Sequence, residues 1–250
     1  TSRGLGDVYK RQVLINTRPK NLSQNINALC AKEKIDLINL HLSEITPISS
    51  KEVIEGWRSK LEYLQSYSNI IFTSQASAIY GLEILKTNID LKKIQSNIFS
   101  IGPATTKIIE DKGIECISPN HSSSEFLAKL IIEKYSGKNL LFCGTNSNRT
   151  LQKMLKNNID EVVCYDLVYS DFYVADINKG PKIVLIYNYL TFSFIHDHVD
   201  HETLLEKIFI VSSQRIKEKI IKIFGNTKYL DMKIVVAESS SDAVSYTHLR

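Results

Sequence analysis

Small hydroxyl and amide residues follow several apolar runs of this 250-residue chain, and their types and spacing suggest a binding chemistry. The clearest case is Phe72-Thr73-Ser74, which ends an apolar run and precedes a stretch with helical spacing. At the start of a helix, free backbone N–H groups and the positive end of the helix dipole attract carboxylates and phosphates. The pattern therefore indicates a site for an anionic small molecule.

The same arrangement recurs along the chain. Ser, Thr and Asn are also ordinary helix N-caps, so helix capping is the simpler explanation for any one cluster taken alone. None of the clusters contains a GxGxxG or GxxxxGKS loop, so a nucleotide-binding fold is not indicated. The further clusters are Asn16-Thr17-Arg18-Pro19, Gly102-Pro103-Ala104-Thr105-Thr106, Cys143 to Arg149, and Val211-Ser212-Ser213-Gln214.

A second chemical signal is the run from His196 to His201, which has the HxHxDH spacing of a hydrolase zinc site. Such a site needs a preceding strand and further ligands downstream. Residues 189–195 have helical spacing instead, and the only later histidine, His248, stands in the C-terminal tail. We interpret the run as a solvated polar loop and expect no metal site; a zinc hydrolase stays as an alternative.

Short apolar runs alternate with amphipathic stretches over the whole chain, which is typical of parallel sheets covered by helices on both faces. About eight such units fit two sheets better than one. We predict an α/β fold with two doubly wound parallel-sheet lobes, joined by two extended crossover strands within 36–46 and 162–173. The first lobe is expected to be discontinuous, with 13–40 plus 174–243, and the second to span 47–163.

Within this scheme the periodicity assigns each element a range. Expected strands are 13–15, 36–45, 69–72, 98–101, 115–117, 139–143, 162–169, 182–187, 208–211 and 233–236. Expected helices are 22–34, 51–65, 76–85, 104–112, 124–135, 150–156, 190–196 and 215–224.

The two ends of the chain are best set aside. Residues 7–12 and 244–249 correspond to a transposon-end sequence and its reverse complement, so 1–12 and 244–250 are interpreted as read-through tails. Of the 31 basic and 27 acidic residues, 27 and 26 remain without these tails, which lowers the net charge from +4 to +1. Neither a nucleic-acid nor a membrane partner is therefore expected.

The four cysteines, Cys30, Cys116, Cys143 and Cys164, are scattered and form no CxxC pair. Nothing in the sequence indicates secretion, and no apolar run is long enough to span a membrane. We therefore expect reduced thiols and a cytoplasmic location.

Three motifs together resemble the uroporphyrinogen-III synthase family. They are the segments 13–19 (VLINTRP), 71–78 (IFTSQASA) and 101–106 (IGPATT), in the order and spacing of that family. Further matches are the segment 122–127 (SSSEFL), after a proline, and the strand-to-helix turn that ends in Arg149. The resemblance extends over about residues 13–240.

This resemblance implies two α/β lobes and a lyase that closes linear hydroxymethylbilane to uroporphyrinogen III. The reaction releases water and inverts the last pyrrole ring, and it requires no metal or organic cofactor. The implied partner is the small-molecule linear tetrapyrrole with its acetate and propionate groups, and the protein is expected to be a monomer. Proton donation to the leaving hydroxyl and folding of the substrate would supply the catalysis.

The resemblance also implies site residues. The family's tyrosine on an extended segment matches Tyr165, or Tyr169 if the register is shifted, and either is equally explained as an ordinary sheet aromatic. Thr105 matches a threonine of the family and is also a candidate helix N-cap, while Arg18 either pairs with a substrate carboxylate or braces the surface. The expected substrate-binding residues are Arg18, Thr73, Ser74, Gly102, Thr105, Ser123, Gly144, Ser212 and Ser213.

Two segments depart from the family pattern. Tyr187-Asn188-Tyr189 stands where the family usually has a Thr-Ser pair, and Ser212-Ser213-Gln214 stands where many relatives have Gly-Pro-Thr. Both weaken residue-level assignments in the first lobe. The alternative function is a non-catalytic, two-lobed binder of an anionic small molecule, which turnover of the substrate would exclude.

Overall fold

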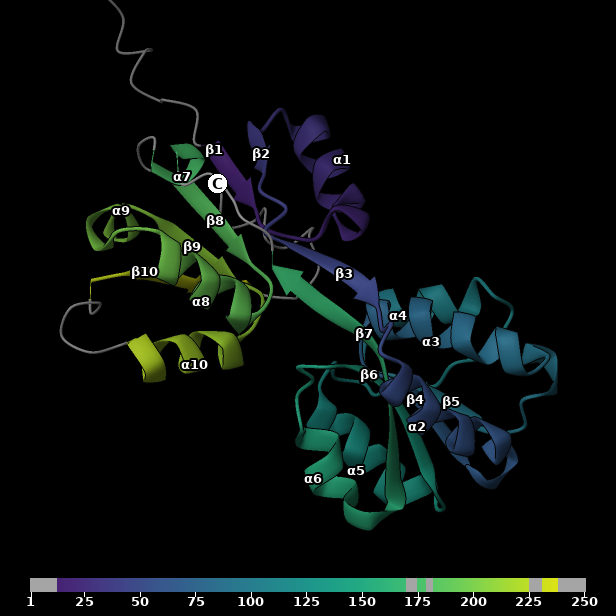
Figure 1. Ribbon diagram of the computed structural model, residues 1–250. Coiled ribbons are helices and arrows are strands. Elements are labelled where there is room, and N and C mark those ends of the chain that lie inside the picture. Colours follow the sequence, from purple (N-terminus) through teal and green to yellow (C-terminus); the bar gives the residue numbers. More distant parts are fainter. Residues whose placement is uncertain (1–12, 170–174, 179–181, 225–230, 238–250) are drawn as a thin grey trace, which may run out of the picture. The chain divides into compact units, whose positions relative to one another are not determined.

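The computed structural model describes residues 13–169, 175–178, 182–224 and 231–237 (Figure 1). The chain divides into two compact units: unit 1 comprises Thr1–Glu44 together with Val168–Arg250, and unit 2 comprises Ile45–Leu167. The proposed read-through tails, 1–12 and 244–250, lie outside the described residues. Each unit is an α/β body with its own sheet.

The sheet of unit 1 has the strand order β10-β9-β8-β1-β2, and its neighbouring strands are all parallel. The order reverses beside β1, because β2 lies on one side of it and β8 on the other. Ligands of open parallel sheets bind outside the carboxyl ends of the strands at such a reversal. The strands are β1 (Val13–Asn16), β2 (Leu37–Asn39), β8 (Lys182–Ile186), β9 (Ile208–Val211) and β10 (Lys233–Val236).

Helices cover both faces of this sheet. Apolar side chains alternate along β8, so that Val184 and Ile186 join one buried cluster while Ile183 and Leu185 join another. Helices α8 and α10 complete the first cluster, and α1 completes the second. The helical elements are η1 (Lys20–Leu22), α1 (Gln24–Glu33), α7 (Ala175–Asn178), α8 (Tyr189–His198), α9 (His201–Leu205) and α10 (Gln214–Phe224).

The sheet of unit 2 has the order β3-β7-β6-β4-β5. β4 is parallel to both β5 and β6, and β6 is parallel to β7, so this sheet reverses its order beside β4. At its edge β3 runs opposite to β7 (Figure 1), and β3 and β7 both cross the unit boundary. The strands are β3 (Ser43–Pro47), β4 (Asn69–Phe72), β5 (Asn97–Ser100), β6 (Asn139–Gly144) and β7 (Ile159–Tyr169).

Two buried clusters also line the faces of the second sheet. On one face, α3 lies so close that a Cβ at Gly81 would stand 2.7 Å from a ring atom of Phe142. A glycine in mid-helix is therefore required by the packing. The helical elements are α2 (Lys51–Glu62), η2 (Leu64–Ser66), α3 (Gln75–Asn88), η3 (Leu91–Lys93), α4 (Pro103–Glu110), α5 (Ser124–Lys134), α6 (Thr150–Leu155) and η4 (Lys156–Asn158).

The predicted fold class is confirmed: both sheets are doubly wound and dominated by parallel pairs, and β3 and β7 are the extended strands that connect the units. One predicted strand is wrong. Residues 115–117 form only a single bridge, between Ile117 and Phe99, because Pro119, two residues after Ile117, has no N–H to continue the pairing.

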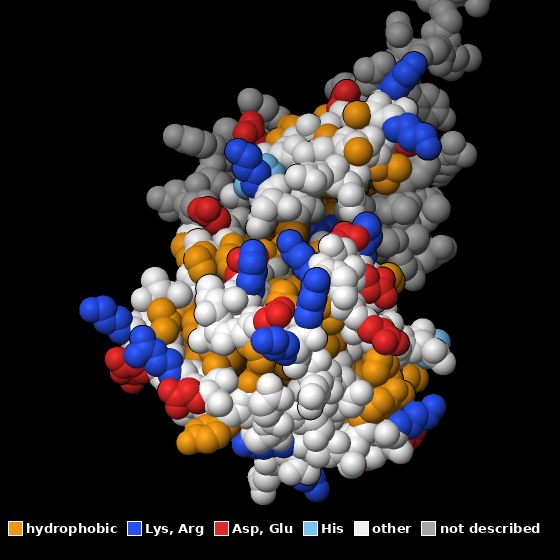
Figure 2. Space-filling view, turned by 90° about the vertical axis from the view of Figure 1, so that its right-hand side faces the viewer, with side chains coloured by type: hydrophobic (Ala, Val, Ile, Leu, Met, Phe, Trp, Pro, Cys, Tyr) orange, Lys and Arg blue, Asp and Glu red, His pale blue; other side chains and the backbone are white. Residues whose placement is uncertain are grey.

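On the face drawn in Figure 2, Lys and Arg side chains lie among Asp and Glu side chains. The presence of both charges on this face agrees with the small net charge that is expected for the chain without its tails. In the described part of the chain, no helix has the length and apolar character needed to cross a lipid bilayer.

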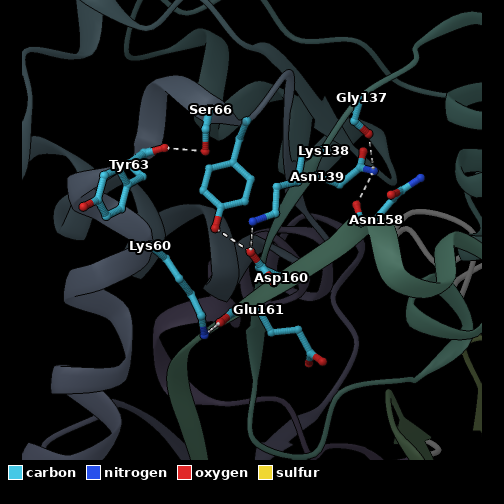
Figure 3. A network of polar contacts seen from close by, with 10 residues as sticks. Lys60, Tyr63, Ser66, Gly137, Lys138, Asn139, Asn158, Asp160 and Glu161 are labelled. Carbon is cyan, nitrogen blue, oxygen red and sulfur yellow. Dashed lines mark hydrogen bonds and ion pairs between the residues drawn. The ribbon is translucent and has the colours of Figure 1, made fainter.

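The amino edge of the unit 2 sheet is held by side-chain contacts (Figure 3). The Asp160 carboxylate accepts a hydrogen bond of 2.6 Å from the Tyr67 hydroxyl and forms an ion pair of 2.7 Å with Lys138. The Lys60 ammonium donates to the carbonyl of Glu161 at 2.6 Å. Lys138 and the Tyr67 hydroxyl hold the pKa of Asp160 below its usual value. These contacts fix the start of β7.

Three asparagines cross the same edge as a ladder. The side-chain amide of Asn97 donates to Asn69 at 3.0 Å, and that of Asn69 donates to Asn139 at 3.0 Å. Asn139 in turn donates to the carbonyl of Asn158 at 2.7 Å (Figure 3). Because these residues are the first of β5, β4 and β6, the ladder locks the register of the sheet at the end away from the predicted site.

Candidate functional site

The carboxyl edge of the unit 2 sheet brings together several predicted site residues. Phe72 pairs in register with Ser100 and with Phe142, so the residues that follow these three strands emerge side by side. Thr73 and Ser74 therefore lie at the same edge as Gly102 and Gly144.

Ser74 begins helix α3 with reciprocal capping. Its Oγ accepts a hydrogen bond from the backbone N–H of Ser77 at 3.1 Å, while the Ser77 Oγ accepts one from the N–H of Ser74 at 2.9 Å. This capping box fixes the side chain and the direction of the helix. One cap satisfies only one N–H of the first turn, so the start of α3 retains donors that have no partner within the helix.

Gly102 begins helix α4, with Pro103 at the first helical position. The Gly102 carbonyl accepts from the N–H groups of Thr105 and Thr106, both at 3.0 Å. The proposed capping role of Thr105 is thus wrong: the residue stands in the first turn and is only 6% exposed. The adjacent Thr106 instead bonds with the hydroxyl of Ser100 at 2.6 Å.

Tyr165 lies at this edge on β7, opposite Gly144. The pairing of β6 with β7 shifts register between Cys143 and Gly144, which places Gly144 opposite Tyr165. A Cβ at Gly144 would stand 2.5 Å from Cζ of Tyr165, so the ring occupies the space that a side chain would fill. Gly144 therefore leaves room for the ring of Tyr165, a role that is compatible with the substrate contact predicted for it.

The Tyr165 hydroxyl lies 3.1 Å from the Oγ of Ser74. Its ring stacks on that of Tyr80, with 6.3 Å between the centroids. Burial raises the pKa of the Tyr165 phenol, and the hydrogen bond with Ser74 partly opposes this rise. The phenol is protonated at neutral pH and is chemically suited to donate a proton.

Ser123 begins helix α5, and its Oγ accepts from the N–H of Phe126 at 3.2 Å. Nearby, Arg149 precedes α6 and forms an ion pair of 2.6 Å with Glu161. The turn that ends in Arg149 is thus tied to β7 by charge.

In unit 1 the carboxyl edge has different chemistry. The buried side chain of Asn16 donates to Asn39 at 2.7 Å and to Ser23 at 3.1 Å. Two residues after Asn16, the guanidinium of Arg18 lies 4.6 Å from the centroid of the Tyr187 ring. The strand order reverses between β1 and β8, and Arg18 and Tyr187 meet at this point.

The two predicted serines of unit 1 follow β9. The Ser212 hydroxyl donates to the carbonyl of Tyr187 at 3.3 Å. The Ser213 carbonyl accepts from the N–H of Ile216 at 3.1 Å and so begins helix α10. Both residues are half-buried at the same edge as Arg18.

Tyr169 belongs to unit 1, whereas Tyr165 belongs to unit 2. The Tyr169 hydroxyl lies 3.2 Å from Asn188 Oδ1 and 3.2 Å from Thr191 Oγ1, and its ring stacks on Phe194 at 5.1 Å. Burial raises the pKa of Tyr169, and the two hydrogen bonds oppose that rise. The contacts attach the end of β7 to helix α8.

The histidine run occupies the end of α8 and the start of α9, so the predicted polar loop is wrong, while the predicted helix before it is confirmed. His198 contacts the carbonyl of Phe194 at 2.7 Å, and Asp200 caps α9 by accepting from the N–H of Thr203 at 2.8 Å. Within the described ranges, no three His, Cys, Asp or Glu side chains are grouped so as to hold a metal ion.

Comparison with protein families matches residues 24–236 to the model described as uroporphyrinogen-III synthase HemD. The chain belongs to the uroporphyrinogen-III synthase family. As the sequence predicted, it is a lyase of porphyrin and haem biosynthesis that forms uroporphyrinogen III. No curated protein sequence matches the chain.

Solved structures of the same family share the fold. A mutant uroporphyrinogen III synthase from the extremely thermophilic bacterium Thermus thermophilus is 11% identical with a TM-score of 0.63, covering 95% of this chain and 97% of that one. A uroporphyrinogen-III synthetase from Helicobacter pylori is 14% identical with a TM-score of 0.63, covering 96% and 100%. At such identities the likeness concerns the fold alone.

Three contacts of the candidate residues, two in unit 2 and one in unit 1, were not predicted from the sequence. They are the bond between Ser74 and Tyr165, the packing of Tyr165 on Gly144, and the bond of Tyr169 to Asn188. The first two depend on which strands are neighbours and on their register. The third had a signal, because Asn188 lies two residues before the predicted helix 190–196 and is the N-cap of α8.

Proposed function

We propose that the protein cyclises hydroxymethylbilane with Tyr165 as the proton donor, while helix N-termini bind the substrate carboxylates. The observation that carries the proposal is the placement of the Tyr165 phenol, which lies between Gly144 and Ser74 at the edge where α3 and α4 begin. A protonated phenol thus stands beside backbone N–H groups that suit carboxylates.

The reaction begins at the hydroxymethyl group of the substrate. Tyr165 donates its proton to the hydroxyl oxygen, the C–O bond breaks, and water leaves with the bonding electrons. The remaining carbocation, stabilised by the pyrrole nitrogen, is attacked by the α carbon of the last pyrrole ring that already carries the methylene bridge to the third ring. The bond from this α carbon to the bridge then breaks, which leaves a carbocation on the bridge that the nitrogen of the third ring stabilises. The other α carbon of the last ring attacks this carbocation and closes the macrocycle with that ring inverted. That ring loses its α hydrogen as a proton when it regains aromaticity, and this proton restores the neutral phenol.

Tyr169 is the weaker candidate for this role. Its hydroxyl bonds with Asn188 and Thr191, and its ring stacks on Phe194, so its contacts are those of a residue that anchors β7. The Tyr165 hydroxyl, by contrast, bonds with Ser74 at the edge where the helix N-termini gather. We therefore assign the proton transfer to Tyr165.

Substrate binding is proposed to rest mainly on backbone N–H groups, supplemented by the Arg18 guanidinium. The stacking of Arg18 on Tyr187 holds the cation at the strand-order reversal of unit 1, where a carboxylate would bind. The proposed binding residues are those expected from the sequence: Arg18, Thr73, Ser74, Gly102, Thr105, Ser123, Gly144, Ser212 and Ser213.

We further propose that the protein acts as a cytoplasmic monomer and uses no cofactor in this reaction. Its four cysteines, all within the described residues, form no disulfide, and three of them are buried, which suits a reducing compartment. Light scattering after size-exclusion chromatography measures the mass in solution, and a dimer mass would contradict the monomer.

The test of the activity is product analysis. Purified protein is mixed with freshly prepared hydroxymethylbilane, and the oxidised porphyrin isomers are separated by chromatography. We expect isomer III to predominate, whereas the spontaneous reaction without protein yields isomer I. Formation of isomer I alone, with tight binding of the substrate, would identify a non-catalytic binder instead.

A further inference from the structure

The side-chain oxygen of Ser74 contacts two groups, the first turn of helix α3 and the hydroxyl of Tyr165. This Oγ lies 3.1 Å from the backbone nitrogen of Ser77 and 3.1 Å from the hydroxyl oxygen of Tyr165. The N–H of Ser77 can only donate, so one lone pair of the Ser74 oxygen is committed to the helix cap. The hydroxyl hydrogen of Ser74 is not used by that cap.

We propose that Ser74 is a positioning residue for Tyr165: its oxygen caps α3, and its hydroxyl hydrogen is donated to the phenol oxygen. This inference rests on the proposed function, in which Tyr165 is the acid. With its oxygen accepting from Ser74, the phenol keeps its own hydrogen for the leaving hydroxyl of the substrate. The helix cap thereby determines the direction of a hydrogen bond at the reacting group.

The surroundings of the phenol leave it few alternative orientations. Gly144 lies against the ring on one side, where a Cβ would come within 2.9 Å of the hydroxyl oxygen. Tyr80 stacks on the ring and donates its own hydroxyl to the carbonyl of Ile45 at 2.8 Å. The titratable groups that act on the phenol are the Cys143 and Cys164 thiols, both buried.

The direction of the bond has an electrostatic consequence. Burial and the two thiols raise the pKa of Tyr165, whereas the bond from Ser74 lowers it. A donated hydrogen bond stabilises the phenolate, so removal of the donor should raise the pKa further. Loss of a purely structural contact would not shift the titration in this direction.

The experiment uses the full chain labelled with 3-fluorotyrosine, which is more acidic than tyrosine and titrates at accessible pH. The ¹⁹F resonance of position 165 is assigned from its loss in the Tyr165→Phe variant. Ser74→Thr retains the cap and the hydroxyl, Ser74→Asp retains the cap without a donor, and Ser74→Ala removes both. Thermal unfolding monitors the fold of each variant.

We expect Ser74→Thr to titrate as the wild type, Ser74→Ala at higher pH, and Ser74→Asp at the highest pH because its carboxylate opposes the phenolate. For Ser74→Ala we expect kcat to fall about tenfold with KM changed less than about twofold, since a misplaced acid loses part of its contribution. Equal midpoints for the Thr, Ala and Asp variants would overturn the proposal. If the titration midpoint shifts as expected but Tyr165→Phe keeps full activity, the hydrogen bond from Ser74 is supported and Tyr165 is refuted as the acid.

Discussion

Both sheets reverse their strand order beside one strand, β1 in unit 1 and β4 in unit 2, but their carboxyl edges differ in chemistry. In unit 2 the edge carries glycine and small hydroxyl residues at the starts of α3 and α4, together with the half-buried phenol of Tyr165. In unit 1 it presents Arg18 stacked on Tyr187, together with an amide network around Asn16. One edge is thus suited to orient reacting groups, and the other to hold charge through side chains.

This difference explains why the departure at Tyr187-Asn188-Tyr189 is compatible with the family fold. Tyr187 supplies the ring beneath Arg18, Asn188 caps α8, and the ring of Tyr189 lies 4.1 Å from the ammonium of Lys219. A Thr-Ser pair would lack these aromatic contacts. The aromatic side chains of Tyr187 and Tyr189 thus have contacts of their own in unit 1.

The largest expected effect separates the two tyrosines. Tyr165→Phe should lower kcat about 100-fold or more, because a general acid contributes about 10²- to 10⁴-fold. Tyr169→Phe removes two hydrogen bonds of the anchor to α8, each worth about 1 kcal/mol, and should chiefly lower stability. Steady-state kinetics and thermal unfolding of both variants measure this contrast, and the reverse ranking in kcat would assign the acid to unit 1.

Gly144→Ala should have the next largest effect. The added Cβ would lie 2.5 Å from the Tyr165 ring, so the ring must move. We expect an overpacking cost of about 1–3 kcal/mol and a lower kcat. The matched control is Gly56→Ala in α2, where no atom lies within 4 Å of the new Cβ and helix propensity should add stability. Unchanged kcat in Gly144→Ala would show that the ring position is irrelevant to turnover.

Arg18 should affect binding rather than chemistry. Arg18→Ala should raise KM about three- to tenfold, as expected for loss of one charge contact of about 1 kcal/mol, with little change in kcat. Tyr187→Leu removes the ring beneath the guanidinium and should raise KM less. The KM of the wild type should increase with salt, and the increase should be smaller in Arg18→Ala; identical salt dependence would exclude a carboxylate contact.

Thr73→Ala should have the smallest effect. If backbone N–H groups bind the carboxylates at this edge, removing a side-chain hydroxyl should change KM less than about twofold and stability by about 0.5 kcal/mol or less. Isothermal titration with the linear tetrapyrrole's stable cyclic product gives the affinity directly. A tenfold loss would show that the Thr73 hydroxyl itself contacts the ligand.

The sequence was sufficient to predict the fold class, because apolar periodicity alternates between strand and helix over almost the whole chain. It also located the turns at Ser74 and Gly102, since strand ends followed by small residues are local features. It failed for Glu115–Ile117, where apolar spacing suggested a strand but Pro119 limits pairing to one bridge. It also misassigned Thr105, because the glycine before Pro103 takes the capping position.

The contacts of Tyr165 were beyond sequence reasoning for a different reason. They depend on the register shift between Cys143 and Gly144, which places a glycine of one strand opposite a tyrosine twenty-one positions later. Local sequence patterns do not reveal which residues lie opposite each other on neighbouring strands. A register shifted by one residue would turn the Tyr165 side chain to the other face of the sheet. Local patterns also do not show that β4 and β7 lie on the two sides of β6.

Because the proposed binding groups at the helix starts are backbone N–H groups, the sequence around them can diverge widely without losing them. Every residue except proline carries an N–H group, so most substitutions in the first turn of α3 or α4 preserve the donors, provided that the turn keeps its shape. Selection would then act mainly on the N-cap positions of these helices and on the glycine that leaves space for the Tyr165 ring. This tolerance is consistent with the shared fold at 11% and 14% identity.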